Sequence, residues 1–94
     1  MRIIAKSRLM ALAATYGDCL TQVTAWYSIA STAQWRSLAE VRQTFRSADV
    51  VGDKTVFNIK GNDYRLIVHI RYETGIIYIK ALLTHAEYDK GNWK

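Results

Sequence analysis

In the first half of the chain, apolar residues recur at the three- and four-residue spacing of amphipathic helices. Ser7 and Ser37 stand where helix N-caps are expected, and Gly17 stands where the first helix should end. The aromatic side chains of this half occupy helical positions, which favours a place in the core over an exposed role in stacking on nucleotides. The pattern predicts a strand over residues 2–6 and helices over 7–16, 18–32 and 38–45, with Trp26, Tyr27, Trp35 and Phe45 in the core.

In the second half the pattern changes to the alternation and the β-branched composition of strands. Strands are predicted over residues 55–59, 64–72 and 76–85, with a turn at 60–63 and a tight turn near Gly75. Three successive strands of this kind pair as an antiparallel meander. With no linker or internal repeat, residues 1–94 are expected to form one α+β domain, its N-terminal helices packed on one face of a small, mainly antiparallel sheet.

The register of the last hairpin decides which residues share a sheet face. A two-residue loop at Thr74 and Gly75 pairs Val68 with Ala81 and gives one wholly apolar face. A three-residue loop starting at Glu73 instead places Lys80 beside Val68 in that face, where an unpaired ion is costly. We therefore expect the two-residue loop. The polar face then carries Arg65, His69 and Arg71, and the buried face carries Leu66, Val68 and Ile70.

Composition narrows the classes of function. Thirteen Lys and Arg against eight Asp and Glu give a net charge of +5, which favours a polyanionic partner such as a nucleic acid. The sequence contains neither a long uncharged apolar run nor a secretory signal, so a cytoplasmic protein without membrane contact is expected. The single cysteine, Cys19, can form neither an internal disulfide nor a zinc cluster, and neither a metal nor a cofactor is predicted.

The C-terminal segment "THAEYDKGNWK" concentrates groups that transfer protons or bind phosphate. Cleavage of RNA without a metal requires a base for the 2′-hydroxyl, an acid for the leaving 5′-oxygen and a cation for the phosphorane. His85 can act as base or acid, and Tyr88 can do so with cations nearby. Arg65, on the neighbouring strand, can hold a phosphate with two hydrogen bonds. Lys60, Arg71, Lys80 and Lys90 are candidates for contact with the RNA backbone, whereas Glu87 and Asp89 either position His85 or, as we expect, stay solvated.

The stretches "VFNIKGNDYRLIVHI" (residues 56–70) and "LTHAEYDKGNW" (residues 83–93) resemble the HigB family of bacterial toxins. The segments "AWY", "AQWRSLAEV" and "SADVVG" of the helical half match it in the same order, so the resemblance covers nearly the whole chain. It implies a RelE-like fold and an mRNA interferase, an endoribonuclease that cuts translated mRNA in the A site of the 30S ribosomal subunit. It also implies a HigA-type helix-turn-helix antitoxin as partner, with contact to DNA only through that antitoxin.

The resemblance implies catalytic roles for Arg65 in the "YRL" strand and for Tyr88, and His85 matches the "THAEYD" pattern. RelE proper has catalytic lysines on the preceding strand, where this chain offers only Lys60, so the assignment of acid and base stays open. Two alternatives also stay open. One is a non-enzymatic, ParE-like binder that poisons DNA gyrase, and the other is a decayed toxin that acts only through its antitoxin.

Overall fold

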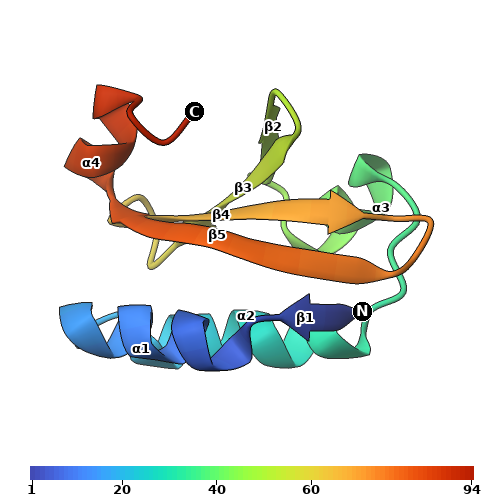
Figure 1. Cartoon of the computed structure of the whole chain (residues 1–94), viewed down its shortest axis with the longest axis horizontal. Helices are drawn as coiled ribbons and strands as arrows, with labels where there is room; N and C mark the ends of the chain where they lie inside the picture. Colours follow the sequence, from blue (N-terminus) through green and yellow to red (C-terminus); the bar gives the residue numbers. More distant parts are fainter.

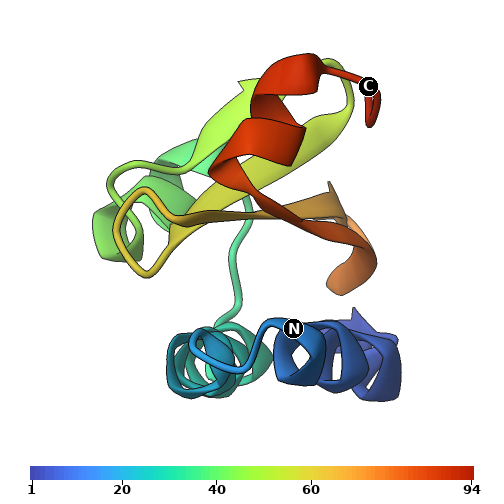
Figure 2. The same cartoon turned by 90° about the vertical axis from the view of Figure 1, so that its left-hand side faces the viewer.

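The computed structural model describes all residues, 1–94, as a five-stranded sheet with helices on both sides. The strand order is β1-β5-β4-β3-β2, in which β1 runs parallel to β5 and the other neighbours are antiparallel. Helices α1 and α2 lie side by side under one face, and the short helix α4 lies on the opposite side of the sheet at one end of β5 (Figures 1 and 2). The predicted α+β class is confirmed.

Most elements lie where the sequence pattern predicts them. The structure contains β1 (Arg2–Ile4), α1 (Lys6–Tyr16), α2 (Leu20–Thr32), α3 (Leu38–Thr44), β2 (Asp49–Val51), β3 (Lys54–Ile59), β4 (Tyr64–Arg71), β5 (Ile76–Thr84) and α4 (His85–Lys90). Ser37 caps α3 by accepting a hydrogen bond from the backbone N–H of Glu40, and Gly17 ends α1 with a positive φ, both as expected. Ser7 does not cap α1, which begins one residue earlier after Ala5. No helix is both long and apolar enough to cross a membrane.

The predicted register of the last hairpin is wrong. Arg71 pairs with Ile76, so four residues form the loop instead of two, and Val68 pairs with Ile79. Lys80 is then an extra residue in β5, a β-bulge, after which Ile67 pairs with Ala81 and Leu66 with Leu82. The bulge leaves Lys80 exposed and turns Leu82 into the core, which strict alternation cannot achieve. The polar and apolar faces of β4 are nevertheless as predicted, because β4 itself has no bulge.

The core lies between α1, α2 and α3 and one face of the sheet. Leu66, Val68 and Ile70 of β4 are buried there as predicted, together with Trp26 and Trp35 from the helical half. Phe57 of β3 joins these aromatic rings, with ring centroids 5.4 Å from Trp26 and 6.4 Å from Trp35. Trp26 and Trp35 are therefore core residues as predicted, whereas Tyr27 and Phe45 are only partly buried and pack against the core.

Candidate active site

Arg65 is a buried cation without a carboxylate partner. Its side chain projects from β4 on the outer face, which we define as the sheet face away from α1 and α2, and the residue is only 9% exposed. Its guanidinium donates hydrogen bonds to the carbonyl oxygens of Asn62 at 3.0 Å and Tyr64 at 3.2 Å. None of the chain's ion pairs includes it. A buried charge without a counterion is costly, so this position favours an incoming anion.

Helix α4 brings two further candidates to Arg65. Thr84 caps the helix by accepting a hydrogen bond from the backbone N–H of Glu87, and the Glu87 side chain accepts one from the Thr84 N–H in return. This capping box starts a helix directly at the end of β5, and Gly91 ends it in the left-handed conformation. Residues 85–90, predicted to be a strand end and tail, are helical, and Thr84, Glu87 and Gly91 carry the signal for a short helix.

His85 has a polar neighbour at each ring nitrogen. Its Nδ1 lies 3.1 Å from Nη2 of Arg65, and its Nε2 lies 3.0 Å from Oδ2 of Asp89. A guanidinium can only donate, so Nδ1 accepts the hydrogen bond from Arg65 and the proton of the neutral ring is on Nε2. Asp89 stays exposed, as expected, and its carboxylate lies beside that protonated nitrogen.

Tyr88 places its ring beside the same guanidinium. The Cζ atom of Arg65 lies 5.3 Å from the centroid of the Tyr88 ring, within the range of a cation–π contact. The indole of Trp93 stacks on Tyr88 with centroids 4.9 Å apart, and its Nε1 donates to the carbonyl oxygen of Tyr88 at 2.8 Å. The structure thus brings Arg65, His85 and Tyr88 together, and Trp93 limits the movement of Tyr88.

Helix α4 is tied to the helical layer through Tyr16. The hydroxyl of Tyr16 lies 3.0 Å from Oε1 of Glu87 and 3.2 Å from the carbonyl oxygen of Leu82. The backbone N–H of Thr84 and then the Tyr16 hydroxyl hold the pKa of Glu87 below its usual value, because both donate to the ionised carboxylate. Glu87 is exposed, as expected, and its hydrogen bonds also anchor the helix that carries His85 and Tyr88.

The turn between β3 and β4 is held by Asp18, at the corner between α1 and α2. The Tyr64 hydroxyl donates a short hydrogen bond to Oδ1 of Asp18, and Nζ of Lys60 lies 2.9 Å from Oδ2. The hydrogen bond to Asp18 raises the pKa of Tyr64 to about 12, and the same bond, followed by the contact with Lys60, lowers the pKa of Asp18. This cluster positions the turn that precedes Arg65.

The four predicted RNA-binding cations are not gathered in one place. Lys60 is paired with Asp18, and Arg71 lies at the far end of β4, paired with Glu73 at 3.2 Å. Lys80, at the bulge of β5, and Lys90, in the last turn of α4, have no acidic partner within ion-pair distance. Lys90 also lines a hollow of about 350 Å³ beside α4, together with Leu83, Glu87, Asn92 and Trp93. Lys80 and Lys90 are thus the more available of the four for an RNA backbone.

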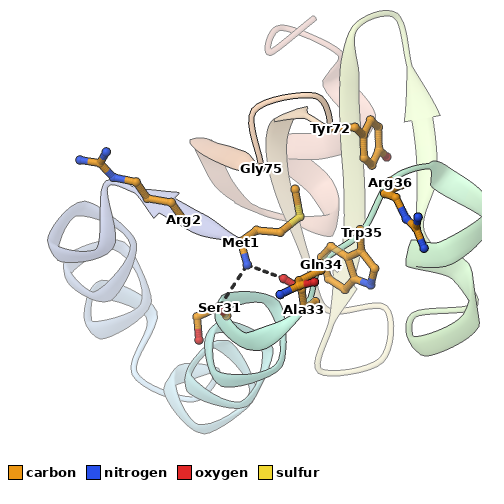
Figure 3. A pocket seen from close by; sticks show the side chains of 9 residues that line it. All are labelled: Met1, Arg2, Ser31, Ala33, Gln34, Trp35, Arg36, Tyr72 and Gly75. Atoms are coloured by element: carbon orange, nitrogen blue, oxygen red, sulfur yellow. Dashed lines mark hydrogen bonds between the residues drawn. The ribbon is translucent and has the colours of Figure 1, made fainter.

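The larger pocket, about 800 Å³, lies at the other end of the sheet (Figure 3). Its lining includes Trp35, Arg36 and Tyr72, and the amino group of Met1 donates to the carbonyl oxygens of Ser31 and Ala33 at its edge. Its lining contains neither a histidine nor a carboxylate. Nowhere in the chain do three or more His, Cys, Asp or Glu side chains converge as metal ligands.

The α+β architecture, in which helices pack on one face of a small, mainly antiparallel sheet, is that of the RelE-like toxins. Residues 19–91 match the family described as HigB toxin, the RelE-like toxic component of a toxin-antitoxin system, and the chain belongs to this family. It is 26% identical over 92 residues to the mRNA interferase toxin HigB of Escherichia coli K12, a match that covers 95% of this chain and 88% of that protein. The mRNA interferase HigB of Escherichia coli O157:H7 and that of Shigella flexneri match to the same extent.

Proposed function

We propose that this protein is an mRNA interferase: a metal-independent endoribonuclease that cleaves translated mRNA on the ribosome in the cytoplasm and is neutralised by a HigA-type antitoxin. The observation that carries the proposal is the buried, carboxylate-free guanidinium of Arg65 within hydrogen-bond distance of His85 and in contact with Tyr88. Membership of the HigB family and the similarity to mRNA interferases support the same reaction.

In the proposed reaction the 2′-oxygen of one nucleotide attacks the adjacent phosphorus, and the bond between phosphorus and the 5′-oxygen breaks. The phosphate binds the guanidinium of Arg65 in place of His85. Nδ1 of His85 can then accept the proton of the 2′-hydroxyl. Asp89, 3.0 Å from Nε2, stabilises the imidazolium that forms. The hydroxyl of Tyr88 then gives its proton to the leaving 5′-oxygen, and Arg65 stabilises the charge on the phosphorane.

Three side chains have little means of bringing a flexible RNA strand into line for this attack. The ribosomal A site supplies that orientation by holding the message in a bent conformation, and orientation is among the largest contributions to catalysis. The test uses purified protein and one message, with and without ribosomes, at fixed salt. We expect efficient cleavage on ribosomes and little cleavage of the free message, and equal rates in the two reactions would contradict the ribosome requirement.

A test in growing cells separates this function from that of a gyrase poison. Expression of the toxin should stop protein synthesis before any sign of DNA damage, and co-expression of the antitoxin should restore growth. An early DNA-damage response with intact messages would favour the ParE-like alternative.

A further inference from the structure

We propose that Tyr78 and His69 form a second RNA subsite on the outer face, a stacking platform for the base of a nucleotide that neighbours the cleavage site. The inference rests on the proposed function and deepens it, because it assigns a place to a base of the same bound strand. The two residues are directly opposite each other on β4 and β5. Their rings stack on each other with centroids 6.2 Å apart and planes 28° from parallel, so the pair forms a short aromatic stack that a base can extend.

The platform is on the same sheet face as the candidate active site. Side chains alternate along β4, so Arg65, Ile67 and His69 all project from the outer face, and Tyr78 joins them because it pairs with His69. Four residues of a strand span about 13 Å, so the platform lies further from Arg65 than the nucleotide whose phosphate is attacked. A base on Tyr78 would therefore belong to an adjoining nucleotide of the same strand.

A hydrogen bond from His69 to the backbone restrains the orientation of the ring pair. Nδ1 of His69 lies 2.8 Å from the carbonyl oxygen of Asp53, and because a carbonyl can only accept, that nitrogen carries a proton and donates. This bond fixes the imidazole, while His69 and Tyr78 both remain partly exposed. An aromatic surface on an open sheet face is the arrangement with which several RNA-binding domains stack unpaired bases.

Charge around the platform suits a polyanion. Nζ of Lys80 lies 5.8 Å from the centroid of the Tyr78 ring, and the bulge leaves this lysine exposed and without an acidic partner. Its ammonium group is thus free to meet a phosphate while the base lies on the neighbouring ring. Lys80, one of the predicted RNA-binding residues, would thus contact a phosphate beside the stacked base. Stacking discriminates little between bases, so the subsite should contribute to affinity without selecting a sequence.

The test measures binding to ribosomes that carry a message with a 2′-deoxynucleotide at the mapped cleavage position, so that the RNA stays intact. We expect Tyr78→Leu to weaken binding about 5- to 150-fold, the range measured for the loss of one base–aromatic stack, and Tyr78→Phe to restore it. Tyr27→Leu is the matched control, because Tyr27 lies on α2 with the ammonium of Lys6 4.8 Å from its ring centroid. It should bind like the parent.

A series of messages that each lack one base locates the contact. At one position beside the cleavage site, removal of the base should weaken parental binding as much as Tyr78→Leu does, and the two changes together should cost no more than either alone. If the effects multiply at every position, or if Tyr78→Phe binds as weakly as Tyr78→Leu, the platform is only structural and the inference fails while the proposed function stands. If the parent does not bind programmed ribosomes at all, the proposed function fails and this inference with it.

Discussion

Arg65 is the residue on which the proposed chemistry depends most directly, because its charge is buried and its neighbours are oriented around it. It contacts His85 by a hydrogen bond and the ring of Tyr88 by a cation–π contact, yet no carboxylate competes for it. The acid that is present, Asp89, binds the far side of His85 instead. This arrangement keeps an anion site open while it restrains the groups that transfer protons.

His85→Ala and Tyr88→Phe should each lower the rate of mRNA cleavage on ribosomes by about 10²- to 10⁴-fold, the usual contribution of a proton-transfer group. Both side chains are at least partly exposed, so the fold should survive. Single-turnover cleavage and circular dichroism measure the two effects. Tyr27→Phe, in the helical layer, serves as control, and parental rates for both site variants would place the active site elsewhere.

Titration of Tyr64 should lower the stability of the folded protein at alkaline pH. Its pKa is raised to about 12 in the folded state, chiefly by the hydrogen bond to Asp18, whereas an unperturbed tyrosine titrates near 10. The folded state therefore holds the phenol proton more tightly than the unfolded state. The resulting stabilisation is complete below about pH 10 and is lost as the pH rises from about 10 to about 12.

Denaturant unfolding at a series of alkaline pH values checks this expectation. The free energy of unfolding of the parent should fall more steeply between about pH 10 and 12 than that of Tyr64→Phe, which has no phenol to titrate at this position. Parallel curves for the two proteins would show that Tyr64 does not couple folding to pH.

At the scale of elements, α4 is a six-residue helix whose position depends on contacts outside itself. Isolated helices of this length do not persist in water, so the capping box and the bond from Tyr16 to Glu87 hold it in place. Strand β4 supplies Arg65, whereas α4 supplies both groups that are proposed to transfer protons. Its attachment to α1 therefore sets the geometry of the site.

Tyr16→Phe should loosen α4 without emptying the core, because only the hydroxyl is removed. We expect a loss of about 0.5–1.5 kcal/mol in stability, the usual net value of one hydrogen bond. Cleavage on ribosomes should show a lower kcat at an almost unchanged KM, since the RNA-binding face is untouched. A change confined to KM, or no change in either constant, would contradict a positioning role for Tyr16.

The sequence predicted some of the helices, strands and turns and missed others, for physical reasons. Caps and turns such as Ser37 and Gly17 act locally, so their signals can be read from neighbouring residues. The bulge at Lys80 is not visible in the sequence, because Leu82 and Leu83 are both apolar and fit either register, and only the structure shows that Leu82 is the buried one. The parallel pairing of β1 with β5 joins opposite ends of the chain, and no local pattern encodes it.

The site was also only partly accessible from sequence. Arg65, His85 and Tyr88 were predicted as its members from chemistry and resemblance, and the structure brings them together. The contact of Asp89 with His85 was only the less favoured alternative, and the role of Tyr16 was not predicted. Asp89 reaches His85 only because residues 85–90 are helical, which puts positions four apart on one face, and Tyr16 is distant in sequence.

At the scale of the whole molecule, the net charge of +5 is divided between paired and unpaired cations. Arg36, Arg42 and Lys54 each have an acidic partner, whereas Lys80 and Lys90 near the proposed RNA path have none. Unpaired cations displace counterions from RNA most effectively, so they should dominate the salt dependence of docking on the ribosome.

The affinity for ribosomes should therefore fall steeply as salt rises. Lys80→Ala and Lys90→Ala should each reduce the slope of the log–log plot of affinity against salt by about one, and Arg36→Ala should change it less. Sedimentation with ribosomes at several salt concentrations measures these slopes. An unchanged slope for both lysine variants would show that the protein docks through another surface.

The order of elements along the chain has a consequence for genetics. All residues of the buried core precede Leu83, whereas His85 and Tyr88 follow it. A nonsense or frameshift allele in codons 85–88 would remove Tyr88, and with it the proposed chemistry, and would leave the core sequence intact, whereas one upstream of Leu82 would remove core residues as well. Survivors selected on the toxin alone would thus include two populations: cells that have lost the protein, and cells that still accumulate a harmless, folded form of it.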